Sequence, residues 1–267
     1  MLPRTAGEAL GMSLRLAGRT AIVIGAARGI GSGVVEVFLE DVDARAVATA
    51  TGMGAGSGQP CEDPDLVFVA VPPQALAHEV AAALRRFPNA TVTDVGSVKA
   101  EPLATLGEED LARYVPGHPM AGREISGAAA GRGDLFEDRP WILTPTAVTE
   151  PARLEQVASM AEQLRAVVRL MDPDEHDRAV ALCSHAPQVV ASLLAAQLVG
   201  ASASDVSVAG PGLRDTTRIA GSDPDLWSQI LLANADHVTP HLQRFAADVS
   251  SFGQALGAGD SGQVREL

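Results

Sequence analysis

Residues able to do chemistry gather in four short segments of this chain. They are 94–99 (DVGSVK), 117–127 (GHPMAGREISG), 176–188 with a His-Asp pair and a Ser-His-Ala-Pro-Gln run, and 212–227 (GLRDTTRIAGSDPDLW). The neutral imidazole of a histidine such as His118 can act as a base near pH 7. The planar guanidinium of Arg218 suits a carboxylate. Each also has a structural explanation, because His118 could cap a loop and Arg218 could form a helix salt bridge with Asp215.

A glycine-rich turn follows the first β-like run, 20–24. Its glycines are Gly25, Gly29 and Gly31. Glycines at such a turn let backbone N–H groups approach a pyrophosphate at a helix N-terminus. The spacing G-x-x-x-G-x-G resembles short-chain dehydrogenases, but that family needs a Tyr with a Lys four residues later. The only tyrosine, Tyr114, has His118 at that spacing, which excludes the short-chain interpretation.

The segment after the glycines is too short for an ordinary crossover. Only two residues separate Gly31 from the β-like run 34–39, whereas a parallel crossover needs about a dozen, usually including a helix. Either 34–39 is the second strand and the first helix is absent, or 32–50 is the helix and the second strand is missing. In the first case Asp41 stands at a strand end, where an acid can bind an adenosine ribose and favours NAD over NADP. The turn therefore predicts a dinucleotide fold with an incomplete first βαβ unit.

The first half of the chain alternates β-like runs with helical stretches, which is typical of a parallel α/β sheet. Further strands are predicted at 66–71, 91–95 and 141–143, and an amphipathic helix over 75–86. Ligands of such sheets bind at the carboxyl ends of the strands. Val71 and Pro72 are therefore expected beside the cofactor.

After Pro145 the pattern becomes helical. Helices are expected over 151–169, 172–199 (bent at Pro187), 210–220 and 223–256. The chain is accordingly divided into a flexible tail (1–17), an α/β dinucleotide-binding-like domain (18–148) and an all-α domain (149–267), with the boundary at 148–150.

Composition limits the classes of partner. The formal net charge of −13 argues against nucleic acid and anionic membranes, which need a basic face. No uninterrupted apolar run approaches the roughly 20 residues of a membrane helix. Cys61 and Cys183 cannot build a disulfide framework, so a cytoplasmic location is expected. No metal site is expected either, because His237 and His241 lack a third ligand.

One basic residue is unusual. Lys99 is the only lysine among 20 lysines and arginines. It is either a chance remnant or a point charge with a specific place.

Taken in order, the four segments resemble the prephenate/arogenate dehydrogenase (TyrA) family from about residue 18 to 255. The resemblance implies a Rossmann-like N-terminal domain and an all-α C-terminal domain that forms a homodimer. It also implies oxidative decarboxylation of a cyclohexadienyl dicarboxylate, with NAD or NADP taking the hydride.

The resemblance also implies roles for individual residues. His118 takes the proton of the substrate's ring hydroxyl, and Ser97 hydrogen-bonds the same hydroxyl and orients the histidine. Arg218 pairs with a substrate carboxylate. The other substrate-site candidates are Arg214, Asp215, Glu124, His185 and Gln188. Gln188 replaces a histidine of the family pattern and cannot carry charge.

The predicted function is therefore an NAD-dependent prephenate or arogenate dehydrogenase of tyrosine synthesis. A close alternative acts on an amino-substituted prephenate in specialised metabolism. A second alternative is a non-oxidative decarboxylating or rearranging enzyme, if the shortened cofactor half has lost NAD. A third is a non-catalytic dimer that senses prephenate or tyrosine, against which the intact set of His118, Ser97 and Arg218 argues.

Overall fold

The computed structural model describes residues 20–24, 36–121 and 131–266, with the backbone alone at 20–24 and 36. The chain forms two compact units. The first comprises Met1–His176 and Ser222–Ile230, and the second Asp177–Gly221 and Leu231–Leu267. The units divide after His176 and not at the expected 148–150. The predicted tail at 1–17 lies outside the described residues.

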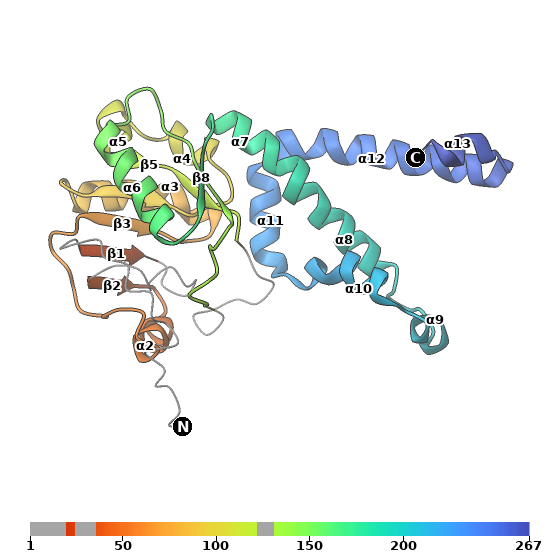
Figure 1. The fold of residues 1–267 in the computed structure, drawn as a ribbon, viewed down its shortest axis with the longest axis horizontal. Helices are drawn as coiled ribbons and strands as arrows, with labels where there is room; N and C mark the ends of the chain where they lie inside the picture. Colours follow the sequence, from red (N-terminus) through yellow and green to blue (C-terminus); the bar gives the residue numbers. More distant parts are fainter. Residues whose placement is uncertain (1–19, 25–35, 122–130, 267) are drawn as a thin grey trace. The chain divides into compact units, whose positions relative to one another are not determined.

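The first unit is built on a five-stranded sheet whose neighbouring strands are all parallel (Figure 1). Its order is β2-β1-β3-β4-β5. The strands are β1 (Thr20–Ile24), β2 (Glu36–Glu40), β3 (Leu66–Val69), β4 (Thr91–Asp94) and β5 (Tyr114–Val115). The chain runs outward from β1 to β2 and returns to the other side of β1 for β3. Open α/β sheets bind ligands at the carboxyl strand ends beside such a reversal.

The structure contains the second strand that the first of the two alternatives predicts after the glycines. Residues 36–40 form β2, which pairs with β1 in register Thr20↔Glu36 to Ile24↔Glu40. The side chains of Val37 and Leu39 are buried in the core. The connection 25–35 lies outside the described residues. The sheet therefore has its second strand.

Helix α3 (Pro73–Arg86) packs on one face of this sheet. Its first residue is a proline, whose fixed φ suits the start of a helix. Leu76, Val80 and Leu84 are buried against the valines of β3 and β4. The short helices of this unit are α2 (Ala44–Gly52), α4 (Ala100–Ala104) and α5 (Glu108–Arg113). The apolar spacing that predicted helix 75–86 is thus the buried face of α3.

A second sheet of three strands follows, in the order β6-β7-β8. The strands are β6 (Gly117–Pro119), β7 (Pro140–Leu143) and β8 (Val167–Leu170). The expected helix 151–169 is wrong in its last part. Helix α6 (Pro151–Gln163) ends, Arg165 takes a positive φ of 62°, and the chain continues as β8 parallel to β7. This pairing keeps the segment in the first unit, which is why the boundary lies later than expected.

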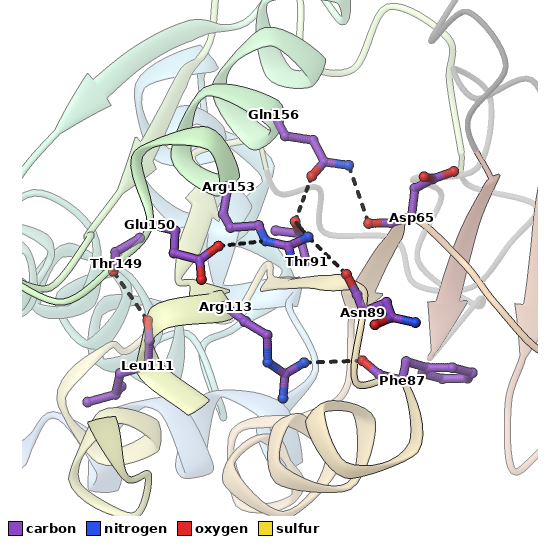
Figure 2. Close-up of polar contacts among 10 residues, drawn as sticks. All are labelled: Asp65, Phe87, Asn89, Thr91, Leu111, Arg113, Thr149, Glu150, Arg153 and Gln156. Atoms are coloured by element: carbon purple, nitrogen blue, oxygen red, sulfur yellow. Dashed lines mark hydrogen bonds and ion pairs between the residues drawn. The ribbon is translucent and has the colours of Figure 1, made fainter. Parts of the chain in front are cut away.

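Polar contacts tie α6 to the amino end of β4 (Figure 2). Thr91 Oγ1 donates to Gln156 Oε1 at 2.6 Å, and Gln156 Nε2 donates to the Asp65 carbonyl at 3.3 Å. Arg153 Nη1 donates to the Asn89 carbonyl at 2.9 Å and to Thr91 Oγ1 at 3.2 Å. These contacts lie at the end of β4 opposite to Asp94. They hold α6 against the sheet and do not involve the carboxyl end of β4, where Asp94 lies.

The second unit is helical. Helix α7 (Pro173–Val180) leads into it, and its elements are η3 (Ala181–His185), α8 (Ala186–Ala196), α9 (Ala203–Ser207), α10 (Pro211–Thr217), η4 (Arg218–Gly221), α12 (Ala235–Ala258) and α13 (Ser261–Arg265). The irregularity expected at Pro187 is the π-helical turn η3 just before it. Proline lacks an N–H and its ring crowds the carbonyl four residues back, so the helix widens there. Asn234 divides the expected helix 223–256 into α11 (Pro224–Ala233) and α12.

This unit leaves much apolar surface exposed. The exposed large apolar side chains include Leu182, Leu193, Val199, Leu232, Phe245 and Val249. The continuous helical segment Pro173–Ala196 has a mean hydropathy of 1.5 in its most apolar window, 28% of which is buried. Its length and composition would allow it to span a membrane. Helices that are packed inside a protein can have the same length and composition. It also carries buried polar groups, among them His185 and Gln188.

Candidate active site

Ser97 and His118 are placed by two strands of the first unit, β4 of the five-stranded sheet and β6 of the three-stranded sheet. Ser97 is half-buried and lies three residues beyond Asp94, the last residue of β4. His118 is buried in β6, where it pairs with Ile142 of β7. The Gly117 N–H donates to Asp94 Oδ2 at 3.2 Å, which brings the start of β6 against the end of β4. Both predicted catalytic residues thus lie near the carboxyl end of β4, Ser97 just after it and His118 next to the Gly117 that bonds to Asp94.

The ring of His118 is held by a second histidine. His118 Nδ1 lies 2.8 Å from His176 Nε2, and both residues are buried. His176 belongs to the first turn and a half of α7, where its N–H donates to the Asp172 carbonyl. One nitrogen of this pair must donate the shared proton. If His118 Nδ1 donates it, the neutral ring keeps its lone pair on Nε2, which is the form a base needs.

A buried ion pair lies next to the segments that carry Ser97 and His118. Lys99 Nζ donates to Asp94 Oδ1 and, at 2.6 Å, to the Gly117 carbonyl. The Tyr114 hydroxyl donates to Asp94 Oδ2 at 2.6 Å. Burial, reinforced by the charge of Asp94 and by this hydrogen bond, raises the pKa of Tyr114 well above its usual value of 10. Tyr114 therefore stays a neutral donor throughout the physiological range.

The predicted cofactor residues that the structure describes follow the carboxyl ends of two strands. Asp41 comes directly after β2 and is half-buried, with one carboxylate oxygen accepting the Asp43 N–H at 2.8 Å. Val71 and Pro72, both half-buried, form the turn between β3 and α3. Gly25, Gly29 and Gly31 lie outside the described residues. An acid and a helix start on the two sides of β1 form an arrangement that fits a dinucleotide.

Two predicted residues of the second unit make hydrogen bonds within it. Asn234 Nδ2 donates to the Asp177 carbonyl at 2.8 Å and lies 3.0 Å from His185 Nδ1. Because the amide nitrogen donates, His185 Nδ1 accepts, and the neutral ring carries its proton on Nε2. Gln188 Nε2 donates to the Ile219 carbonyl at 2.9 Å, which ties α8 to η4. Gln188 thus positions the turn in which Arg218 lies.

The predicted carboxylate-binding residues are exposed on a short helix. Arg214 and Asp215 lie in α10, and Arg218 begins the 3-10 turn η4 that continues it. The single helix expected over 210–220 therefore changes to a 3-10 turn after Thr217. Glu124 lies outside the described residues. Within the described ranges, no group of three or more His, Cys, Asp or Glu side chains could hold a metal ion.

Sequence reasoning left some of this site out. His176 begins the third segment, 176–188, but no spacing rule predicts its contact with His118, which spans 58 positions. Lys99 was conspicuous as the only lysine, but nothing local pointed to its partners. Tyr114 served only to exclude the short-chain dehydrogenase interpretation. The sole signal available for the last two was their rarity in this composition.

Comparison with known families covers almost the whole chain. The family model described as prephenate dehydrogenase, nucleotide-binding domain, matches residues 26–170. The model described as prephenate dehydrogenase, dimerization domain, matches residues 172–267. The border between the two matches lies close to the division of the structure after His176.

Individual relatives agree with these matches. A cyclohexadienyl dehydrogenase of Zymomonas mobilis is 35% identical over 211 residues, which cover 76% of this chain and 71% of that protein. The probable prephenate dehydrogenase NovF of Streptomyces niveus is 35% identical over 251 residues, which cover 89% of this chain and 69% of that protein.

Solved structures give the same result. Prephenate dehydrogenase from Aquifex aeolicus, in complex with hydroxyphenyl propionate and NAD+, superposes with a TM-score of 0.82 at 27% identity, covering 94% of this chain and 95% of that one. Synechocystis arogenate dehydrogenase superposes with a TM-score of 0.72 at 25% identity, covering 93% and 95%.

Proposed function

Because the chain belongs to the prephenate dehydrogenase family of oxidoreductases, we propose that it catalyses the NAD-dependent oxidative decarboxylation of prephenate or arogenate. The observation that carries this proposal is the His118–His176 pair near the carboxyl end of β4. His118 Nδ1 contacts His176 Nε2 at 2.8 Å, near the same strand end as Ser97. This arrangement supplies an oriented base and a hydroxyl for one reacting oxygen.

The chain's own task is to move one proton. His118 Nε2 takes the proton of the ring hydroxyl, while Ser97 hydrogen-bonds the same oxygen. Bound NAD would supply the acceptor for the hydride that leaves the hydroxyl-bearing carbon. The bond to the ring carboxylate breaks, its electron pair makes the ring aromatic, and CO2 leaves. The phenolic oxygen takes the proton back from His118, so the imidazole ends neutral and no net proton is released.

The cofactor's place is supported by the sheet. The reversal of strand order between β1 and β3 is where doubly wound sheets hold dinucleotides. The candidate phosphate-binding glycines are Gly25, Gly29 and Gly31. Asp41 would accept hydrogen bonds from the adenosine ribose, and an acid there disfavours the extra phosphate of NADP. The turn of Val71 and Pro72 would line the same edge. The presence of β2 beside β1 supports this place for NAD.

We assign substrate binding to residues that can bind the two carboxylates of the substrate. Arg218 is the proposed carboxylate partner, supported by Arg214 and held in place by Asp215. His185, whose Nε2 carries the proton, is a further candidate donor to the substrate. Gln188 donates to the Ile219 carbonyl, so its proposed effect on the substrate passes through the Arg218 turn. Glu124, outside the described residues, stays a candidate for the substrate site.

We also propose a homodimer. The C-terminal match is to a dimerization domain, and the exposed apolar side chains of the second unit need a cover in water. A second copy of the chain supplies such a cover and also accounts for the apolar segment Pro173–Ala196. A cytoplasmic location and the absence of nucleic acid and membrane partners remain part of this proposal.

Kinetics with paired substrates and cofactors test the function. Prephenate and arogenate are each offered with NAD and with NADP, and reduced cofactor is followed by its absorbance. The proposal expects saturable turnover with NAD and at least one of the two substrates, and a large loss in His118→Asn. Absence of turnover with all four pairs, in a protein that binds NAD, would reject the dehydrogenase assignment.

A further inference from the structure

The only lysine and the only tyrosine of the chain meet at one carboxylate. Lys99 Nζ donates to Asp94 Oδ1, and the Tyr114 hydroxyl donates to Asp94 Oδ2 at 2.6 Å. All three residues are 0% exposed. A fully buried ion pair is a poor source of stability, since desolvation offsets most of the attraction. Such a pair therefore calls for an explanation beyond holding the fold together.

The same carboxylate accepts hydrogen bonds from two backbone amides. The Gly96 N–H donates to Asp94 Oδ1 at 2.7 Å, and the Gly117 N–H donates to Oδ2 at 3.2 Å. Lys99 Nζ completes the link by donating to the Gly117 carbonyl at 2.6 Å. Gly96 directly precedes Ser97, and Gly117 directly precedes His118. One carboxylate thus holds the two segments that carry the proposed reacting side chains.

The chain passes close to its neighbours at both glycines. A Cβ added to Gly96 would lie 2.5 Å from Leu76 Cδ2 and 3.0 Å from Asp94 Oδ1. A Cβ added to Gly117 would lie 2.8 Å from the Asp94 carbonyl oxygen and 3.1 Å from Trp141 Nε1. Backbone atoms cannot yield as the end of a flexible side chain can. Gly117 is therefore required, because its Cβ would meet the backbone of Asp94, whereas the neighbours of Gly96 are side-chain atoms of Leu76 and Asp94.

We propose that Asp94, Lys99 and Tyr114 form a clamp whose function is to fix Ser97 relative to His118. The three are positioning residues, and the charge of Lys99 serves Asp94 rather than the substrate. The proposal rests on the proposed function, because fixing these two side chains matters only if both meet one substrate hydroxyl. A base misplaced by about 1 Å loses on the order of a hundredfold in rate.

Tyr114→Phe is the variant that tests the clamp. It keeps the buried ring and removes one donor from Asp94 Oδ2. Lys99→Met would leave the carboxylate buried without its cation and can fail to fold. Thr91→Val is the matched control, because it removes a buried hydroxyl at the other end of the same strand, bonded to Gln156 Oε1 at 2.6 Å.

The first readout needs no activity. Amide hydrogen exchange of Gly96 and Gly117, followed by NMR in the full-length protein, reports the two N–H groups that the carboxylate holds. We expect exchange at both sites to be about tenfold faster in Tyr114→Phe and unchanged in Thr91→Val. Unchanged exchange in Tyr114→Phe, or equal acceleration in the control, would overturn the clamp.

The second readout is a double-mutant cycle. Tyr114→Phe is expected to lower kcat about tenfold with little change in KM, and to have no further effect in a His118→Asn background. Equal fold losses in both backgrounds would mean that Tyr114 acts independently of His118, against the proposal. If the wild type turns over neither prephenate nor arogenate, the proposed function fails, while the exchange measurement still decides whether the clamp exists.

Discussion

The rings of His118 and His176 meet edge to face, with Nδ1 of the first 2.8 Å from Nε2 of the second, centroids 5.1 Å apart and planes at 67°. This contact joins β6 to the start of α7 within the first unit. It determines which nitrogen of His118 can face a substrate. A base oriented by a neighbouring group is a recurrent arrangement in proton transfer and nucleophile activation. His176 thus deserves the first test.

Replacing His176 by leucine should lower kcat by about 10- to 100-fold, the effect usual for losing a group that orients another. KM for NAD should stay unchanged. His176→Gln, which keeps a hydrogen-bonding end, should recover part of the rate. Steady-state kinetics across pH check this prediction, and a wild-type kcat in folded His176→Leu would remove the orienting role.

Replacing His118 by asparagine should lower kcat by roughly 10² to 10⁴, the usual contribution of a general base. Asparagine keeps a polar side chain of similar reach, so NAD binding and thermal unfolding should match the wild type. Single-turnover kinetics and a melting curve together check the prediction. A folded His118→Asn with unchanged rate would show that another group takes the proton.

The single tyrosine offers a pH test. Burial raises the pKa of Tyr114 well above 10, whereas the unfolded chain ionises near pH 10. Below pH 10 both states keep the proton and the contribution to stability is complete. Above pH 10 the unfolded state loses its proton first, so unfolding becomes easier by at most about 1.4 kcal/mol per pH unit until the folded pKa is reached.

Tyrosinate absorbance should therefore appear only on unfolding, and Tyr114→Phe should lose this alkaline slope. An ordinary tyrosine titration in the native protein would contradict the buried geometry.

Replacing Arg218 by alanine should weaken substrate binding by several kcal/mol if its charge-assisted pair with a carboxylate is desolvated, as about 2–5 kcal/mol is typical. The exposed position of Arg218 makes a loss of fold stability unexpected. Affinity for substrate or product, measured by calorimetry in the presence of NAD, checks the assignment. Affinity equal to the wild type would place the carboxylate elsewhere.

Gln188 should act through the turn that it holds. Gln188→Leu removes the bond from Nε2 to the Ile219 carbonyl, so KM for substrate should rise while kcat changes little. Gln188→His can restore a donor to the same carbonyl and should recover part of the loss. An effect on kcat alone would instead indicate that Gln188 acts on the reacting atoms.

Local signals predicted much of the first unit. Buried β-like runs bounded by prolines or glycines gave β3 and β4, and an apolar face at helical spacing gave α3. The strand β8 was missed because its four residues continue the helical period of α6. Its extended form depends on pairing with β7, a partner distant in sequence. The domain boundary was misplaced for the same reason.

The site divides in a similar way. Ser97 and His118 lie in segments whose residue order identified them, and the structure brings both near the carboxyl end of β4. The role of His176 depends on a contact across 58 positions, which no spacing rule could give. Lys99 stood out by its rarity, yet its partners Asp94 and Gly117 are defined only by the fold.

The most direct test of the function is to incubate the purified protein with prephenate, with and without NAD, and to identify the products by mass spectrometry. The account predicts 4-hydroxyphenylpyruvate only when NAD is present, with NADH formed in equal amount. The same incubation with arogenate should yield tyrosine if the amino-substituted side chain is preferred. Equal consumption of substrate without NAD would contradict the account and show a non-oxidative enzyme built on this fold.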